Sequence, residues 1–211
     1  MTGNRSLAQS ALAGASAVLR LPIAYRLFRR LVGGDLDRYV SEFVKPRPGD
    51  KVLDIGCGPG DMLGALHGVD YLGLDISPEY IEAAQRRFGA AGRFLVADVG
   101  AATVGEERGQ FDIVLATGVL HHLDDERAAR LFELARLALK PGGRLITYDG
   151  CYVPEQSRMA RWVLSQDRGK FVRNRDEYVR LASAYFPTIR HHVRHDLLHI
   201  PYTHLIMYCE N

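Results

Sequence analysis

The chain has 211 residues, of which 47% are hydrophobic and 25% are charged, and its net charge is +2. This length can bury one continuous core and is short for two domains, so we expect a single domain over residues 1–211. The small net charge argues against a DNA-binding protein and disfavours an RNA-binding one. Cys57, Cys151 and Cys209 lack the close spacing of a disulfide framework or a metal site, which indicates a reducing, cytoplasmic setting.

The first 34 residues differ from the rest in charge, because they contain five arginines and no acid. Between Ile23 and Val32, apolar residues recur at helical spacing with arginines on the opposite face. This pattern predicts an N-terminal helical cap, residues 1–45, that covers a ligand site. A basic helix in peripheral contact with a membrane and a transit peptide are the two alternatives. No run of residues reaches the roughly 20 apolar positions of a membrane span.

A short apolar strand at residues 52–55 leads into three glycines at alternate positions, Gly56, Gly58 and Gly60. Glycine tolerates positive φ and has no side chain, so a ligand can lie directly against this loop. A second strand, residues 71–74, ends at Asp75. That spacing from the glycine loop is the one at which nucleotide-binding α/β units present a carboxylate to the ribose hydroxyls. The pattern therefore predicts a nucleoside site.

Two acids near the loop restrict the class of ligand that can bind there. Asp61 stands where dinucleotide dehydrogenases have the third glycine of their G-x-G-x-x-G motif, and an acid there opposes a pyrophosphate. Asp54 and Asp61 would instead attract a ligand that bears sulfonium and ammonium groups. A nicotinamide-dependent dehydrogenase is thus the disfavoured alternative.

The rest of the chain alternates strands and helices as far as residue 150. The apolar patterns predict strands at 94–97, 111–116 and 144–148 and helices at 61–67, 77–88 and 124–139. Continuous apolar strands alternating with helices favour an α/β fold, a three-layer doubly wound sheet that is mostly parallel. Two last strands, 188–196 and 203–209, have too little chain between them for a crossover and should pair antiparallel. In such a sheet the ligand lies at the carboxyl ends of the strands.

Five segments in this order resemble the motifs of class I S-adenosylmethionine-dependent methyltransferases, which are Rossmann-like and seven-stranded. Asp54–Gly60 is similar to the first motif, Leu74–Ser77 to the segment with the ribose acid, and Val96–Val99 to the adenine-contacting segment. Phe111–His122 is similar to the fourth strand and its loop, and Leu139–Ile146 to the turn into the fifth strand. The resemblance covers residues 40–150, and residues 46–150 are expected to form the cofactor-binding core.

The resemblance implies a methyltransferase with S-adenosylmethionine as its cofactor and an antiparallel last strand. It also implies which residues contact the cofactor. The expected set is Asp54, Gly56, Cys57, Gly58, Gly60, Asp75, Ile76, Asp98, Val99, Thr117 and Gly118.

Residues 151–187 are expected to be a helical insert that binds the methyl acceptor, with residues 188–211 as closing strands. Between Arg158 and Arg175 this insert carries six cations and a single acid, Asp167, with aromatic residues interleaved. Arginines bind phosphates and carboxylates bidentately, so this composition predicts a small anionic acceptor. The alternative is a solvated helix face whose apolar side, Met159, Trp162 and Val163, packs on the sheet.

Methylation of a hydroxyl needs a base, whereas many N-methylations do not. The candidates are His122, His121, Asp149 and Tyr152, all expected at the ligand end of the sheet. We take His122 as the base if one exists, while a structural or cofactor-packing role for at least one of the two histidines is the alternative. No metal site is predicted, because the five histidines between His191 and His204 have no acid or cysteine at ligand spacing.

The expected function is therefore O-methylation of a small or lipid- or phosphate-linked metabolite such as a sugar. N- or C-methylation and a non-catalytic S-adenosylmethionine-binding partner subunit are the alternatives. The fourth strand is followed by Thr117–His122 and by nothing like Asn-Pro-Pro-Tyr, so DNA bases are disfavoured as acceptors. The oligomeric state is not predicted.

Overall fold

A computed structural model of the protein describes residues 36–99, 107–167 and 169–210. Its centre is a seven-stranded sheet with the order β3-β2-β1-β4-β5-β7-β6. Strands β1 to β5 are parallel, and β7 runs antiparallel to both β5 and β6. The strands are β1 (Lys51–Ile55), β2 (Asp70–Asp75), β3 (Arg93–Val96), β4 (Phe111–Thr117), β5 (Leu139–Gly150), β6 (Thr188–Arg194) and β7 (His204–Glu210). This confirms the predicted doubly wound sheet and its antiparallel last strand.

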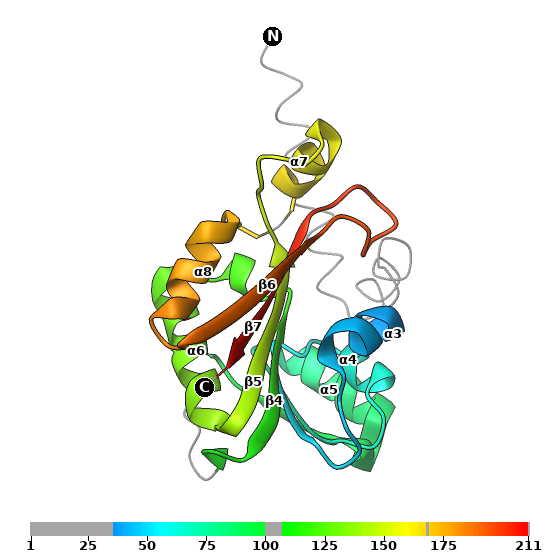
Figure 1. Cartoon of the computed structure of the whole chain (residues 1–211). Helices are drawn as coiled ribbons and strands as arrows, with labels where there is room; N and C mark the ends of the chain where they lie inside the picture. The colour runs from blue at the N-terminus through cyan, green and yellow to red at the C-terminus, as the bar shows by residue number, and fades with distance from the viewer. Residues whose placement is uncertain (1–35, 100–106, 168, 211) are drawn as a thin grey trace.

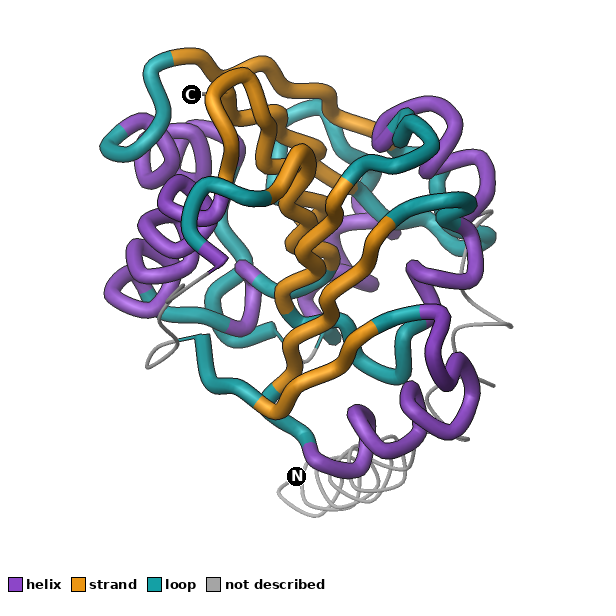
Figure 2. Tube along the Cα trace, turned by 90° about the horizontal axis from the view of Figure 1, so that it is seen from below, coloured by secondary structure: helices purple, strands orange, loops and turns teal. Residues whose placement is uncertain are grey.

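Helices cover both faces of the sheet, as Figures 1 and 2 show. On one face lie α3 (Leu36–Tyr39), the π-helical turn η1 (Val40–Val44), α4 (Asp61–Ala65) and α5 (Pro78–Phe88), and on the other lie α6 (Asp125–Ala138) and α8 (Arg175–Ser183). Short 3₁₀ turns occupy Gly89–Ala91 (η2) and Leu120–His122 (η4). Helix α7 (Arg158–Ser165) follows β5 and lies apart, beyond the end of the sheet (Figure 1). Each face has its own apolar core, as a three-layer fold requires.

Capping residues explain where three helices begin. The Ser77 hydroxyl accepts a hydrogen bond from the Tyr80 backbone amide, with proline at the first helical position of α5. The Asp124 carboxylate caps α6 in the same way. Asn174 and Glu177 form a reciprocal capping box at α8. These helix starts follow directly from local sequence.

One boundary differs from the prediction. The helix expected over 124–139 ends at Ala138, and β5 begins at Leu139, five residues before the expected strand. Leu139 pairs with Phe111 of β4, and the ladder then shifts register before Ile113 pairs with Arg144. The intervening Pro-Gly-Gly segment hides this early pairing from a sequence reading, because it breaks the apolar run.

The predicted N-terminal cap is described only in part, because residues 1–35 lie outside the described residues. The part that follows packs on the sheet: Tyr39, Val40, Phe43 and Val44 are buried in the core on that face. Across the described stretches, no helix is both long and apolar enough to cross a membrane.

Arg173 joins the insert to the core of the domain. It is only 8% exposed, and its guanidinium donates to the carbonyl oxygens of Leu120 and Leu123 at 3.1 and 2.8 Å and to the Asp125 carboxylate at 2.6 Å. The prediction that this arginine belongs to an acceptor-facing basic surface is therefore wrong. The sequence shows its charge but not the two buried carbonyls that it satisfies.

This contact makes a stability prediction. Arg173→Met leaves two buried carbonyls without their donor, so we expect the free energy of unfolding to fall by about 2–4 kcal/mol. Urea unfolding measures this change. The matched control is Arg175→Met, because Arg175 is exposed and pairs with the exposed Asp176, and it should change stability by less than about 0.5 kcal/mol. Equal losses in the two variants would contradict the assigned role.

Candidate functional site

The glycine loop after β1 has a backbone conformation that favours glycine. Gly56, Gly58 and Gly60 have φ angles of 74, 55 and 79°, which side-chain-bearing residues rarely adopt. The amides of Gly56 and Cys57 both donate to the Leu74 carbonyl, at 2.7 and 2.9 Å, and tie the loop to β2. A Cβ atom at Gly56 would meet Val119, whereas at Gly58 it would meet nothing within 4 Å. The loop therefore packs closely at its start and faces open space at its middle.

Asp75 lies at the end of β2 directly beside this loop. Its carboxylate accepts hydrogen bonds from the backbone amides of Gly58 and Ser77, at 2.8 and 2.9 Å. Burial raises the pKa of this carboxyl, whereas the hydrogen bonds from the same two amides lower it in part. The side chain is thus fixed at the adjoining carboxyl ends of β1 and β2, where the predicted ribose would lie.

Asp54 and Cys57 have structural partners within the site. The Asp54 carboxylate is 2% exposed and accepts a 2.6 Å hydrogen bond from the Tyr71 hydroxyl. Cys57 is buried against Gly73, and burial raises the pKa of its thiol far above the usual range. A thiol that stays protonated is a poor nucleophile.

The remaining expected cofactor residues lie along the same edge of the sheet. Ile76 follows Asp75 and is 60% exposed, so it offers an apolar surface beside the predicted ribose position. Asp98 follows β3 and forms a 3.5 Å ion pair with Arg127, while the half-buried Val99 packs on the core. Thr117 ends β4, and the amide of Gly118 (φ 71°) donates to the Tyr148 carbonyl at 2.7 Å.

His121 and Asp149 form a buried pair at the ends of β4 and β5. His121 Nδ1 is 2.8 Å from Asp149 Oδ1, and the His121 backbone amide donates to the same oxygen at 3.2 Å. His121 is 8% exposed and Asp149 2%, and no hydrogen bond to the other oxygen of Asp149 is seen within the described ranges. The neighbouring His122 is exposed. The prediction from sequence took His122 as the base, but in the structure the Asp149 carboxylate orients the ring of His121 instead.

A second carboxylate approaches the other side of the His121 ring. Asp167 Oδ1 is 3.5 Å from His121 Nε2, and Asp167 also accepts hydrogen bonds from the Tyr202 hydroxyl at 2.7 Å and from the Gly169 amide at 2.8 Å. Burial raises the pKa of Asp167, but the neighbouring His121 and these hydrogen bonds outweigh it, so the net shift is downward. From the sequence, Asp167 could be recognised only as the single acid of a basic stretch. No sequence pattern linked Tyr202 to the site.

The insert differs from one expectation. Met159 and Trp162 on α7 are 63% and 65% exposed, so the interpretation that they pack on the sheet is wrong. The helix buries Ala160 and Leu164 instead. Tyr152, the last catalytic candidate, is half-buried, and its ring stacks under the Arg161 guanidinium at 5.1 Å.

The histidines between His191 and His204 do not come together at a single site. His204 stacks between Tyr148 and Tyr202, with ring centroids 4.3 and 4.6 Å away, and His195 lies 3.1 Å from the Thr203 hydroxyl. In the part of the chain that the structure describes, no group of three or more histidine, cysteine or acidic residues could hold a metal ion.

The arrangement fits a nucleoside ligand on chemical grounds. An ionised Asp75 can accept two hydroxyl hydrogen bonds, Gly58 leaves space against the backbone, and Ile76 offers an apolar cover. These groups lie at the carboxyl ends of β1 and β2, next to the point where the strand order reverses between β1 and β4. Fold and site together define a nucleoside-binding Rossmann-like domain.

Comparison with known proteins specifies the family. A model of the methyltransferase domain matches residues 52–143, a range that holds the glycine loop, Asp75, Asp98 and His121. These residues are therefore a methyltransferase domain of the class I, Rossmann-like kind, a family that uses S-adenosylmethionine.

Individual relatives differ in the atom that they methylate. An O-methyltransferase from Pyrenophora dematioidea is 32% identical over 130 residues, which cover 56% of this chain and 47% of that protein. Phosphoethanolamine N-methyltransferase 1 from Zea mays is 30% identical over 58% of this chain and 25% of its own length. Geranyl diphosphate C-methyltransferase from Streptomyces coelicolor shares the fold, with a TM-score of 0.64, 18% identity and coverage of 82% and 78%. The chain spans about half the length, or less, of the curated relatives named here.

Proposed function

We propose that the chain transfers a methyl group from S-adenosylmethionine to an oxygen atom of a small, anionic acceptor. The observation that carries the choice of oxygen is the buried His121–Asp149 pair, because a hydroxyl acceptor must lose a proton and this pair can take it. The O-methyltransferase from Pyrenophora dematioidea supports the same choice.

The proposed mechanism assigns each side chain a separate task. When bound, S-adenosylmethionine supplies a methyl group that is electrophilic because it is attached to a sulfonium. Asp75 and the glycine loop hold the nucleoside, and Asp54 keeps the end of β1 in place through Tyr71. Asp149 accepts from Nδ1 of His121, which leaves Nε2 as the basic nitrogen.

Asp167 completes the proposed proton path. Its Oδ1 is 3.5 Å from His121 Nε2, too far for a good hydrogen bond and too close for another oxygen to fit between them. An acceptor hydroxyl that donates to Nε2 would therefore take the place of the Asp167 carboxylate beside that nitrogen. The hydroxyl proton passes to Nε2 as the new oxygen–carbon bond forms and the carbon–sulfur bond breaks. Asp149 and Asp167 then flank the imidazolium and stabilise its charge.

Features of the insert support an acceptor with both anionic and apolar parts. Arg158 and Arg161 are exposed on α7 beside the exposed Met159 and Trp162. Two of the proteins compared above are named for phosphate-bearing acceptors, phosphoethanolamine and geranyl diphosphate. We therefore propose a lipid- or phosphate-linked metabolite as the acceptor class.

The function is tested with isotope-labelled methyl donor and a panel of hydroxylated, phosphate-bearing metabolites. NMR of the labelled product distinguishes an O-methyl from an N- or C-methyl group. An O-methyl product supports the proposal. A product labelled only at nitrogen or carbon would assign this chain to those reactions, and donor binding without turnover on any acceptor would favour a non-catalytic partner subunit.

A further inference from the structure

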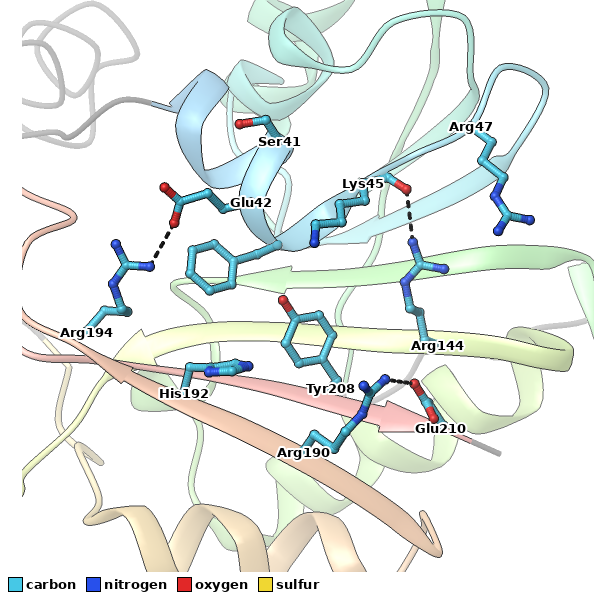
Figure 3. Close-up of a pocket in the computed structure, with 11 residues that line it drawn as sticks. Ser41, Glu42, Lys45, Arg47, Arg144, Arg190, His192, Arg194, Tyr208 and Glu210 are labelled. Atoms are coloured by element: carbon cyan, nitrogen blue, oxygen red, sulfur yellow. Dashed lines mark hydrogen bonds and ion pairs between the residues drawn. The ribbon is translucent and has the colours of Figure 1, made fainter.

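A separate pocket lies between η1 and the β6–β7 edge of the sheet (Figure 3). Its volume is about 890 Å³, within the range of small-molecule sites. Arg144 lies in the amino-terminal half of β5 and Arg47 precedes β1, whereas the glycine loop follows β1. Arg47, Arg144 and Glu210 thus lie at the end of the strands opposite to the glycine loop, and the pocket extends from there along β6 to Arg194. Its charged lining residues are Glu42, Lys45, Arg47, Arg144, Arg190, Arg194 and Glu210.

The two acids in this lining are already engaged. Glu42 pairs with Arg194 at 2.8 Å, and Glu210 pairs with Arg190. The side chains of Lys45, Arg47 and Arg144 form no ion pair with any carboxylate among the residues that the structure describes. Three cations therefore line the pocket with no carboxylate partner among the described residues, and a ligand that enters it gains most if it is an anion.

Arg144 is fixed in place before any ligand binds. Its guanidinium donates to the carbonyls of Val44 and Lys45, at 2.7 and 3.2 Å, where η1 ends. These bonds use one nitrogen and leave the other donors of the fork for a second partner. A guanidinium held in this way loses little conformational freedom when it binds a phosphate.

Lys45 stands in an unusual backbone conformation at the rim. Its φ of 48° makes it the one non-glycine residue with positive φ in the described ranges. It follows the last residue of η1, and its amide donates to the Val40 carbonyl at 2.8 Å, a position that normally favours glycine. Figure 3 shows its amine and the Tyr208 hydroxyl facing the same space. A lysine at a position that favours glycine is a backbone outlier, and we take it as a reason to examine what its amine can bind.

Aromatic rings form the floor of the pocket. His192 lies edge-on to Tyr208, with centroids 5.9 Å apart, and the Arg190 guanidinium lies 5.8 Å from the Tyr208 ring. Burial raises the pKa of Tyr208, and the nearby arginines only reduce this shift. The phenol therefore keeps its proton and can donate a hydrogen bond to an anion.

We propose that this pocket binds the phosphate or pyrophosphate group of a small metabolite, at a site separate from the methyl-transfer centre. Arg144 and Lys45 contact the phosphate oxygens, Tyr208 donates a hydrogen bond, and Arg47 adds positive charge at the rim. The ligand must bring negative charge, which the chain's own first 34 residues, with five arginines and no acid, do not have.

Calorimetric titration of the full chain with inorganic pyrophosphate tests this site. The titration is done with S-adenosylmethionine in excess, so that the cofactor edge does not contribute. We expect one saturable site, and we expect Lys45→Gly/Arg144→Gln to weaken it by about tenfold or more, because each variant position removes a charged hydrogen-bond donor. Lys45→Gly alone should weaken binding without harming the fold, because glycine suits the backbone there.

The matched control is Arg86→Gln/Arg130→Gln, which removes the same charge from the exposed faces of α5 and α6. This control should bind pyrophosphate like the unaltered chain. The proposal is overturned if the unaltered chain shows no saturable binding up to about 10 mM pyrophosphate. It is also overturned if the pocket variants and the control lose affinity equally, since the attraction would then be a general effect of net charge.

Discussion

Replacing Asp75 with alanine should weaken S-adenosylmethionine binding by at least about 100-fold. The carboxylate is proposed to accept both ribose hydroxyls, and each hydrogen bond to a charged group contributes about 1.5–3 kcal/mol. The same oxygens accept from Gly58 and Ser77, so the variant also loses the contact that shapes the middle of the glycine loop. Calorimetric titration of purified Asp75→Ala measures the loss.

The matched control is Asp70→Asn, which removes an acid from the other end of β2. Asp70 is exposed and its contact with Lys51 is a long 4.0 Å ion pair, so this variant should bind the cofactor like the unaltered chain. Unchanged affinity in Asp75→Ala, with the fold intact, would show that the nucleoside does not lie at the end of β2.

Asp75 also predicts the direction of a pH dependence. Burial raises its pKa in the folded chain, so the carboxylate takes up a proton at a higher pH than an exposed aspartate does. A protonated carboxyl cannot accept both ribose hydroxyls through two charged oxygens. Cofactor affinity should therefore be full above this raised pKa and fall as the pH is lowered through it, an effect that titrations at several pH values would show. An affinity that rises on acidification would contradict the assignment.

His121→Ala should lower kcat by about 100- to 10,000-fold and leave cofactor binding nearly unchanged. The magnitude is that of a lost general base, and the binding should survive because the ribose and glycine-loop contacts are not altered. Steady-state kinetics on the acceptor found by the labelling experiment, together with cofactor titration, separates the two effects.

Two variants control for the histidine assignment. His122→Ala changes an exposed ring next in sequence and should reduce kcat far less. Asp149→Asn removes the charge that orients His121 and should lower kcat while shifting the acidic limb of its pH profile, which a purely structural contact would not do. If His122→Ala causes the greater loss of turnover, the sequence-based choice of His122 is right and the geometric one is wrong.

The cofactor half of the molecule could be predicted from sequence because its signals are local. Each element is specified by residues within it or next to it. Apolar runs specify the strands, the three glycines specify the loop, and the caps at Ser77 and Asp124 specify where two helices begin. The spacing between Gly56 and Asp75 places both at adjoining strand ends once the strands are parallel. No long-range contact has to be known in advance.

The acceptor half could not be predicted in the same way. The contact of His121 with Asp149 and Asp167 joins residues 28 and 46 positions apart, and Tyr202 reaches Asp167 from a third segment. Arg173 looked like an acceptor-binding cation until the buried Leu120 and Leu123 carbonyls were placed around it. Charge is visible in a sequence, but its burial and its partners depend on tertiary packing.

The most direct test of the account is parallel calorimetric titration of the full chain with S-adenosylmethionine and with NADH. We predict one S-adenosylmethionine site per chain with micromolar affinity and no NADH binding. Asp61, which pairs with Arg87, begins α4 at the position where dinucleotide-binding loops carry the third glycine that lets the helix pack closely. Binding of NADH, or the absence of any S-adenosylmethionine binding, would contradict the assignment of this edge of the sheet to a sulfonium-bearing nucleoside.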